Sequence, residues 1–235
     1  MTPSAGAAKQ TQIRFGGMRT PAGYLFELTG GRLCLDLANT VDERASDQPI
    51  ELLERYQDLL DWGAQAGAVT RAEAAALAAE SLRRPAAAAA ALGRTRQLRE
   101  SIFCACRAAA RRRAIPHGAL SALNRAIAGS LANRRIVQRG RRLALAWREN
   151  DRPNLDRVLW AAAASAADLL ASPFLARVKI CPGAGCAWLF LDRSRNGTRR
   201  WCDMSVCGNR AKARRHYARV RREKGEQARP GPGTA

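Results

Sequence analysis

Apolar residues recur at helical spacing through much of the chain. Over residues 49–66 the apolar side chains fall on one face of a helix. At 70–84 a Thr and a Glu three residues apart form a capping box, which marks a helix start. The same spacing, punctuated by prolines, predicts a mostly helical first part of the chain. The predicted helices span residues 49–66, 70–84, 85–114, 116–131 and 155–170, with a short one at 173–180.

Two stretches alternate between apolar and polar residues instead, and we interpret each as a β-hairpin. The first joins Tyr24–Leu28 to Leu33–Leu37 across two glycines. The second joins Ile136–Gln138 to Leu143–Trp147 across an Arg-Gly pair. Residues 1–22 are small and polar without periodicity, so we expect a disordered arm there. The predicted fold class is α+β, mostly α.

Four of the seven cysteines form two close pairs with the pattern C-x4-C-x15-C-x4-C. Two tight turns that each carry two thiolates are typical of a structural zinc site. Two disulfides, or four free buried cysteines, are the alternatives; the first would leave three cysteines over, and the second does not suit paired clusters flanked by charge. We therefore predict a structural Zn²⁺. The predicted ligands are Cys181, Cys186, Cys202 and Cys207.

The residues around the cysteines predict a knuckle, then a hairpin, then a helix, as in a treble-clef-like zinc finger. Residues 188–192 alternate like a strand, Asn196-Gly197 is a turn signal, and 199–202 then form the returning strand. A helix is expected from Met204 to about Gly225, with Cys207 in its first turn.

Basic residues dominate the composition. The formal net charge is +20, with 40 Lys or Arg against 20 Asp or Glu. Such a chain is drawn to polyanions, of which nucleic acid is the commonest inside a cell, although a charge run can also be a solvated surface. Residues 193–229 hold 13 Lys or Arg against three acidic residues. The predicted nucleic-acid contacts are Arg195, Arg199, Arg200, Arg210, Lys212, Arg214, Arg215, Arg219 and Arg222.

The last predicted helix has two kinds of surface. Lys212, Arg215, Arg219 and Arg222 form a basic stripe, and Arg210, Arg214 and Arg221 are expected to flank it. Another side carries Val206, Ala213, Tyr217 and Val220, which we expect to pack on the hairpin. Asn209 either braces the zinc turn, which we favour, or contacts a base.

Asp36, Asn39 and Arg44 follow an apolar run and allow two interpretations. They can cap and brace the following turn, which we favour. Alternatively, they line a pocket for a small ligand.

Two segments resemble known families. The run C-x4-C-x-WLFLD-x-SRN…RRWC-x-M-x-VCGNRAKARRHYAR resembles the CGNR zinc finger, and GGRLCLDLANT resembles the start of the ABATE domain. The resemblance implies a stress-induced transcription regulator that binds DNA. We divide the chain into an arm (1–22), an ABATE-like domain (23–177), a zinc finger (178–224) and a flexible tail (225–235).

The leading functional prediction is a zinc-dependent DNA-binding transcriptional regulator whose N-terminal domain senses a ligand or partner. An RNA- or ribosome-associated protein that uses the same basic finger is the alternative. The sequence lacks the common catalytic motifs, so we do not expect an enzyme. It also lacks a membrane-length apolar run and a signal peptide, so we expect a cytoplasmic protein. A small-molecule effector and a homodimer remain open.

Overall fold

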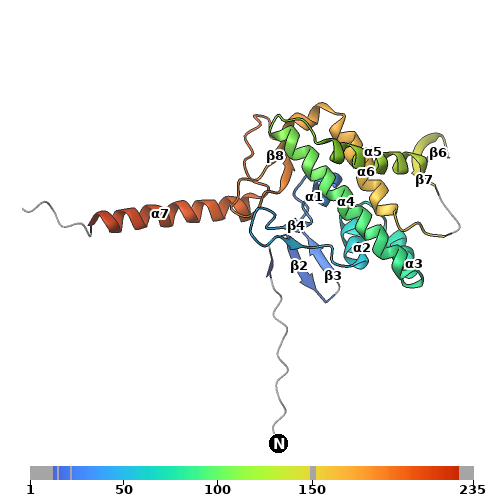
Figure 1. Ribbon diagram of the computed structural model, residues 1–235, viewed down its shortest axis with the longest axis horizontal. Coiled ribbons are helices and arrows are strands. Elements are labelled where there is room, and N and C mark those ends of the chain that lie inside the picture. Colours follow the sequence, from blue (N-terminus) through green and yellow to red (C-terminus); the bar gives the residue numbers. More distant parts are fainter. Residues whose placement is uncertain (1–12, 15, 22, 149–151, 228–235) are drawn as a thin grey trace, which may run out of the picture.

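The computed structural model describes residues 13–227, apart from 15, 22 and 149–151. Figure 1 shows a helical body from which one long helix, α7, projects away. The described helices of the body are α1 (Leu33–Ala38), α2 (Tyr56–Gln65), α3 (Arg71–Arg83), α4 (Pro85–Ala110), α5 (His117–Ala132) and α6 (Arg157–Leu170).

Helix α4 is the centre of the body and packs against α1, α5 and α6. Its buried side includes Leu92, Leu98, Ile102 and Cys106, spaced as one helical face requires. Proline at its first position fits the helix start, and Thr70 with Glu73 forms the predicted capping box on α3. The prediction of a mostly helical fold with small antiparallel hairpins is confirmed.

The first predicted hairpin is wrong. Residues 33–38 form helix α1, not a strand, and its side chains Cys34, Leu35, Leu37 and Ala38 are fully buried. An apolar run this short fits a buried strand and a buried helix equally well, so periodicity alone could not separate them.

Tyr24 instead belongs to β3 (Gly23–Phe26), which pairs antiparallel with β2 (Gly17–Thr20); β2 also pairs with β1 (Ile13–Arg14). Strands β1 and β2 lie within residues 1–22, so the prediction of a disordered arm is wrong there. The rest of that arm, residues 1–12, lies outside the described residues, as does the tail from 228.

The second predicted hairpin is confirmed, as β6 (Arg134–Arg139) and β7 (Arg142–Trp147), which form a two-stranded sheet of their own among the described strands. The helix predicted at 49–66 begins only at Tyr56, because Ile50–Glu51 forms β5 and pairs with β4 (Val41–Asp42).

The zinc-finger region follows a short 3-10 helix (Pro173–Arg177) and begins with β8 (Val178–Ile180), which pairs with β9 (Leu189–Leu191). Strand β9 therefore does not pair with residues 199–202, and the predicted partner strand is wrong. Val178, Leu189 and Leu191 belong to the main core, whereas Phe190 packs with the cysteines. Strand β9 thus has one face on the helices and one on the cysteines.

Candidate metal centre

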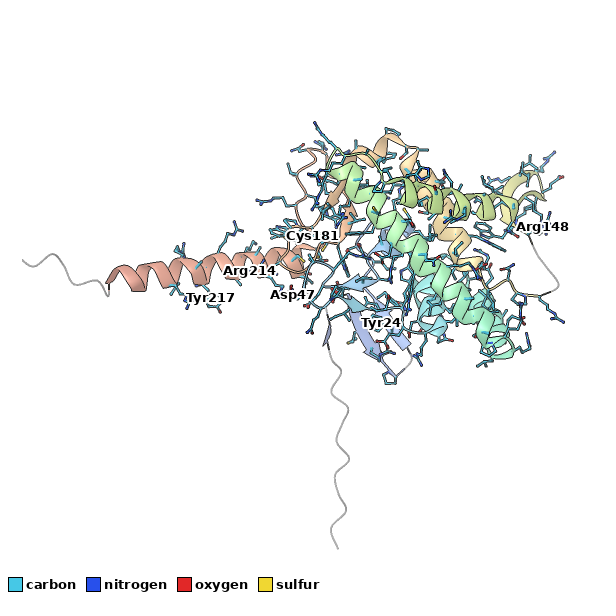
Figure 2. The ribbon with its side chains drawn as sticks, viewed as in Figure 1. Tyr24, Asp47, Arg148, Cys181, Arg214 and Tyr217 are labelled. Atoms are coloured by element: carbon cyan, nitrogen blue, oxygen red, sulfur yellow. The ribbon has the colours of Figure 1, made fainter. Side chains whose placement is uncertain are left out.

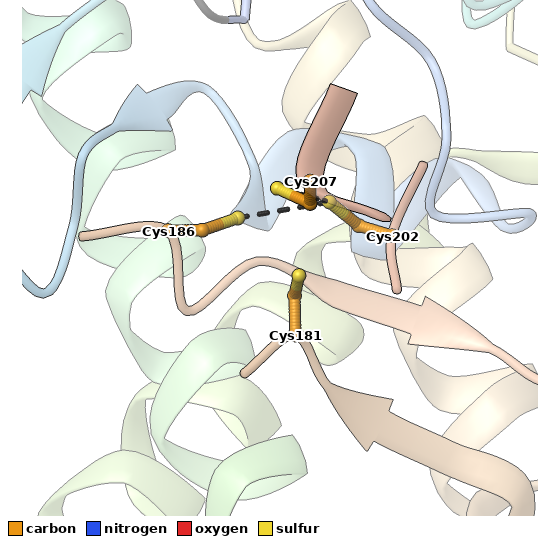
Figure 3. A group of neighbouring side chains, drawn as sticks. All are labelled: Cys181, Cys186, Cys202 and Cys207. Atoms are coloured by element: carbon orange, nitrogen blue, oxygen red, sulfur yellow. Dashed lines mark hydrogen bonds between the residues drawn. The ribbon is translucent and has the colours of Figure 1, made fainter. Parts of the chain in front are cut away.

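The four predicted cysteine ligands come together at one point between β8, β9 and the start of α7 (Figure 3). Their sulfur atoms all lie within 4.8 Å of one another. The Sγ atoms of Cys186 and Cys202 are 3.6 Å apart, and those of Cys202 and Cys207 are 3.7 Å apart. Cys186 is half-buried and the other three are buried. Among the described residues no other group of His, Cys, Asp or Glu has this spacing.

The spacing fits a zinc ion. Four sulfurs about 2.3 Å from one tetrahedral Zn²⁺ lie about 3.8 Å from each other. Gly183 lies directly against the site: a Cβ there would lie 3.0 Å from the Cys207 sulfur and 3.4 Å from the Cys181 sulfur. A site with four thiolate ligands keeps no open coordination position, so a zinc ion here is structural. The predicted cofactor is confirmed.

The first cysteine pair lies in the loop of the β8–β9 hairpin. The Cys181 N–H donates to the Trp188 carbonyl at 2.8 Å, and the Cys186 N–H donates to the Gly183 carbonyl at 3.0 Å. Gly185 and Ala187 have φ values of 77° and 55°, which reverse the chain inside the loop. The knuckle thus closes a hairpin instead of preceding one.

The second pair leads directly into α7 (Asn209–Gln227). Asp203 caps this start: its carboxylate accepts hydrogen bonds from the backbone N–H of Ser205 at 2.6 Å and of Val206 at 3.1 Å. Residues Met204–Gly208 form a π-helical turn that carries Cys207. The predicted position of Cys207 in the first turn is correct, and the metal centre thereby fixes the base of α7.

A hydrogen-bond network centred on Asp192, which the sequence pattern does not reveal, holds the loop at 192–202. Asp192, 1% exposed, accepts hydrogen bonds from Lys179 Nζ at 2.6 Å, the Ser194 N–H at 2.9 Å and the Arg199 N–H at 3.1 Å. Burial alone raises the pKa of Asp192, but the hydrogen bonds and charge of Lys179 and those of Ser194 outweigh it and hold the pKa well below its usual range. The only sign of this network in the sequence was Lys179, which lies in the segment directly before the first cysteine.

Arg199 is turned inward. Its guanidinium donates to the carbonyls of Thr29 at 3.1 Å and Trp201 at 3.0 Å, and also to that of Cys202. It also lies 4.5 Å from the centre of the Phe190 ring. These contacts brace the loop, so we leave Arg199 out of the proposed nucleic-acid interface.

The metal centre is tied to the helical body by buried hydrogen bonds. Asn39 Nδ2 donates to the Leu189 carbonyl at 2.9 Å, and Asn39 Oδ1 accepts from the Leu189 N–H at 2.8 Å. Trp188 Nε1 donates to the Val41 carbonyl at 2.9 Å. The finger is therefore packed directly on the helical body.

The other two members of the predicted ligand pocket also have internal partners. Asp36 accepts a hydrogen bond from the Gly30 N–H at 2.8 Å, and burial raises its pKa to about 6. Arg44 forms an ion pair with Glu100 at 2.6 Å and lies over the Phe103 ring. With Asn39, these contacts favour the bracing interpretation over a pocket.

The basic side chains of α7 that the structure describes are exposed on a helix that leaves the body (Figure 2). Tyr217 is 68% exposed and Ala213 is exposed, so the predicted packing of this side on the hairpin is wrong. At 3.6 residues per turn, Arg210, Arg214 and Arg221 lie opposite the stripe of Lys212, Arg215 and Arg219 instead of flanking it. Arg195 and Arg200 are exposed on the loop before the helix. Arg222 lies in α7 beyond the side chains that the structure describes.

Two family models match the chain. The ABATE model, described as "Putative stress-induced transcription regulator", matches residues 31–173, more than half of the chain. The chain belongs to the ABATE family. The CGNR zinc finger model matches residues 177–220 and contains all four cysteines, so both resemblances are confirmed, in the predicted order. No curated protein matches this ABATE chain.

The two family descriptions make this ABATE protein a metal-binding regulator, and neither names an enzyme. In the part of the chain that the structure describes, no helix has the length and apolar character needed to cross a membrane.

Proposed function

We propose that the protein is a zinc-dependent transcriptional regulator that binds duplex DNA through α7, while its helical body senses a ligand or partner. The observation that supports this most is the position of α7. The four-cysteine centre anchors the first turn of the helix, and the following turns extend away from the body with basic side chains exposed.

The distribution of charge on α7 suits a major groove. An α-helix fits this groove and is then flanked by a phosphate backbone on each side. Helix α7 offers one basic row for each backbone. One is the stripe of Lys212, Arg215 and Arg219, and the other is the opposite row of Arg210, Arg214 and Arg221. Contacts to phosphates position a protein but carry no sequence information, so specificity would come from a smaller set of residues.

The test compares two triple variants with equal loss of charge. Replacing Lys212, Arg215 and Arg219 by Ala should weaken binding to duplex DNA and reduce the slope of log K against log salt by about 2–3. The matched control replaces Arg135, Arg139 and Arg142 on the exposed β6–β7 hairpin by Ala, and should change the slope much less. Fluorescence anisotropy over a salt series measures both.

Selection from a random DNA pool, with and without a zinc chelator, then tests specificity. We expect one enriched motif that disappears on chelation. An unchanged slope in the α7 variant would refute the role of this helix. Tighter binding to structured RNA than to duplex DNA would favour the RNA-associated alternative.

A further inference from the structure

An open cavity of about 540 Å³ lies between the starts of helices α4 and α6, at the end of the body away from the zinc finger (Figure 1). Arg84, Ala87 and Arg94 line it from α4 and the residue before it, and residues 152–156 line it from the segment that leads into α6. Its volume is in the range typical of sites for small molecules. None of these residues belongs to the metal centre.

Three arginines line the cavity against a single carboxylate, that of Asp156. Arg94 donates from Nε and Nη2 to the same oxygen, Asp156 Oδ1, at 3.1 and 2.8 Å, and Arg84 lies 3.6 Å from Glu80. Arg152 is exposed, and within the described part of the chain no hydrogen bond or ion pair occupies it. Guanidinium groups with unused donors around one cavity suit an anion, because their planar fork matches phosphate and carboxylate oxygens.

The starts of α4 and α6 add backbone donors at the same place. The first N–H groups of an α-helix have no partner within the helix and carry partial positive charge. In α3 the side chains of Thr70 and Glu73 cap this end, but α4 and α6 have neither a side-chain cap nor an acidic residue in the first turn. An anion in the cavity would supply the negative charge that both helix starts lack.

We propose that this cavity binds a small phosphate monoester, with its phosphoryl group at Arg84, Arg94 and Arg152. A phosphoryl group carries about 1.5 to 2 negative charges near neutral pH and three strong acceptor oxygens, which suits three guanidinium groups better than the single charge of a carboxylate. The half-buried Pro153 and the buried Leu155 provide apolar wall for the organic part. The proposal names the ligand class for the sensing role of the body, and it rests on the proposed function for its biological meaning.

Helix α4 connects the cavity to the zinc finger. Its first turn lines the cavity, and the helix also contacts β8, the strand that leads directly to Cys181. At 26 residues it is about 39 Å long. A ligand that holds the start of α4 therefore acts on the helix against which the finger is packed, and it is expected to change the affinity of the protein for DNA.

Calorimetric titration of the zinc-loaded full-length protein with ribose 5-phosphate tests the site directly. Ribose is the neutral analogue, and inorganic phosphate is the anion without an organic part. We expect ribose 5-phosphate to bind, ribose not to bind, and inorganic phosphate to bind about fivefold more weakly or worse, because it leaves the apolar wall uncovered. Equal affinities for ribose 5-phosphate and inorganic phosphate would overturn the assignment of an ester.

Two pairs of variants with matched changes of charge locate the binding. Asn154→Asp keeps the oxygen that accepts from the Asp156 N–H at 3.0 Å and adds a negative charge to the cavity. It should weaken binding by about fivefold or more and leave thermal stability close to that of the wild type. Asn124→Asp, at an exposed position on α5, should bind as the wild type does. Arg152→Gln should also weaken binding, and Arg125→Gln, again exposed on α5, should not.

Failure of the inference and failure of the proposed function give different results. No binding, or equal binding by the wild type and all four variants, overturns the site even if DNA binding is intact. Conversely, binding that is lost only in the two cavity variants supports the site even if the protein does not bind DNA. Where both occur, ribose 5-phosphate should shift DNA affinity in the wild type and not in Asn154→Asp, at equal ionic strength; an equal shift in both would show that it acts elsewhere.

Discussion

Two amide side chains take the place of a neighbouring strand in this protein. Asn39 on the turn after α1 bonds to both the N–H and the carbonyl of Leu189, and Gln65 on α2 bonds to the Phe26 N–H at 2.9 Å and the Tyr24 carbonyl at 2.6 Å. Each amide satisfies a donor and an acceptor at a strand edge that would otherwise be buried unpaired. Because each partner lies far away along the chain, neither pairing could be predicted from the sequence.

The charge of Asp192 should contribute to the free energy of unfolding by an amount that depends on pH. Its folded-state pKa lies below the usual value, so its ionised form stabilises the protein above the unfolded pKa of about 4, and this stabilisation is lost as the pH falls through the lower folded pKa. Asp192→Asn should lower the free energy of unfolding by about 2 kcal/mol near neutral pH. Denaturation of both proteins over a pH series should show this difference shrinking below about pH 4. A difference that stays constant into acid would show that the charge is not the cause.

Elements with strong local signals were predictable, and those defined by distant contacts were not. The capping box of α3, Pro85 at the start of α4 and the Arg139-Gly140 turn mark their elements within a few residues. Strand β8 is only three residues long and its partner follows the cysteine loop, so the pattern at 199–202 was mistaken for the returning strand. The apolar residues on the Tyr217 side of α7 recur at helical spacing, as on a packing surface. They are too few to bury the helix.

Removal of zinc should affect some elements and spare others. Residues 202–208 and the base of α7 depend on the cysteines, whereas β8 and β9 are also held by Val178, Leu189 and Leu191 in the main core. Chelation should therefore abolish hydrogen-exchange protection in residues 202–208 and at the start of α7, with much smaller changes in α4 and α6. Cys207→Ser should reproduce this effect, and Cys104→Ser, which alters a cysteine far from the site in sequence, should not. Equal loss of protection throughout α4 and α6 would contradict this division.

At the scale of the whole molecule, the two segments that match the family models are not structurally separate units. The ABATE match ends at residue 173 and the CGNR match begins at 177, yet side chains from both sides of that boundary form one core. Asn39, Trp188 and Arg199 add hydrogen bonds across it. A ligand or a metal that acts on one part is therefore expected to affect the other.

Two truncations test whether the two segments fold as one cooperative unit. Ending the chain at residue 176 removes Val178, Leu189 and Leu191 from the core, a loss of about 5–8 kcal/mol of burial, which is comparable with the whole stability of a domain of roughly 5–15 kcal/mol. This fragment should show no cooperative thermal transition. Ending the chain at residue 211 removes most of α7 but keeps the four cysteines and the buried Ala211, so it should bind zinc and melt close to the full-length protein. If the 1–176 fragment melts cooperatively near the full-length temperature, the helical body folds without the finger, and coupling between the two would have to come from the bound ligand or metal alone.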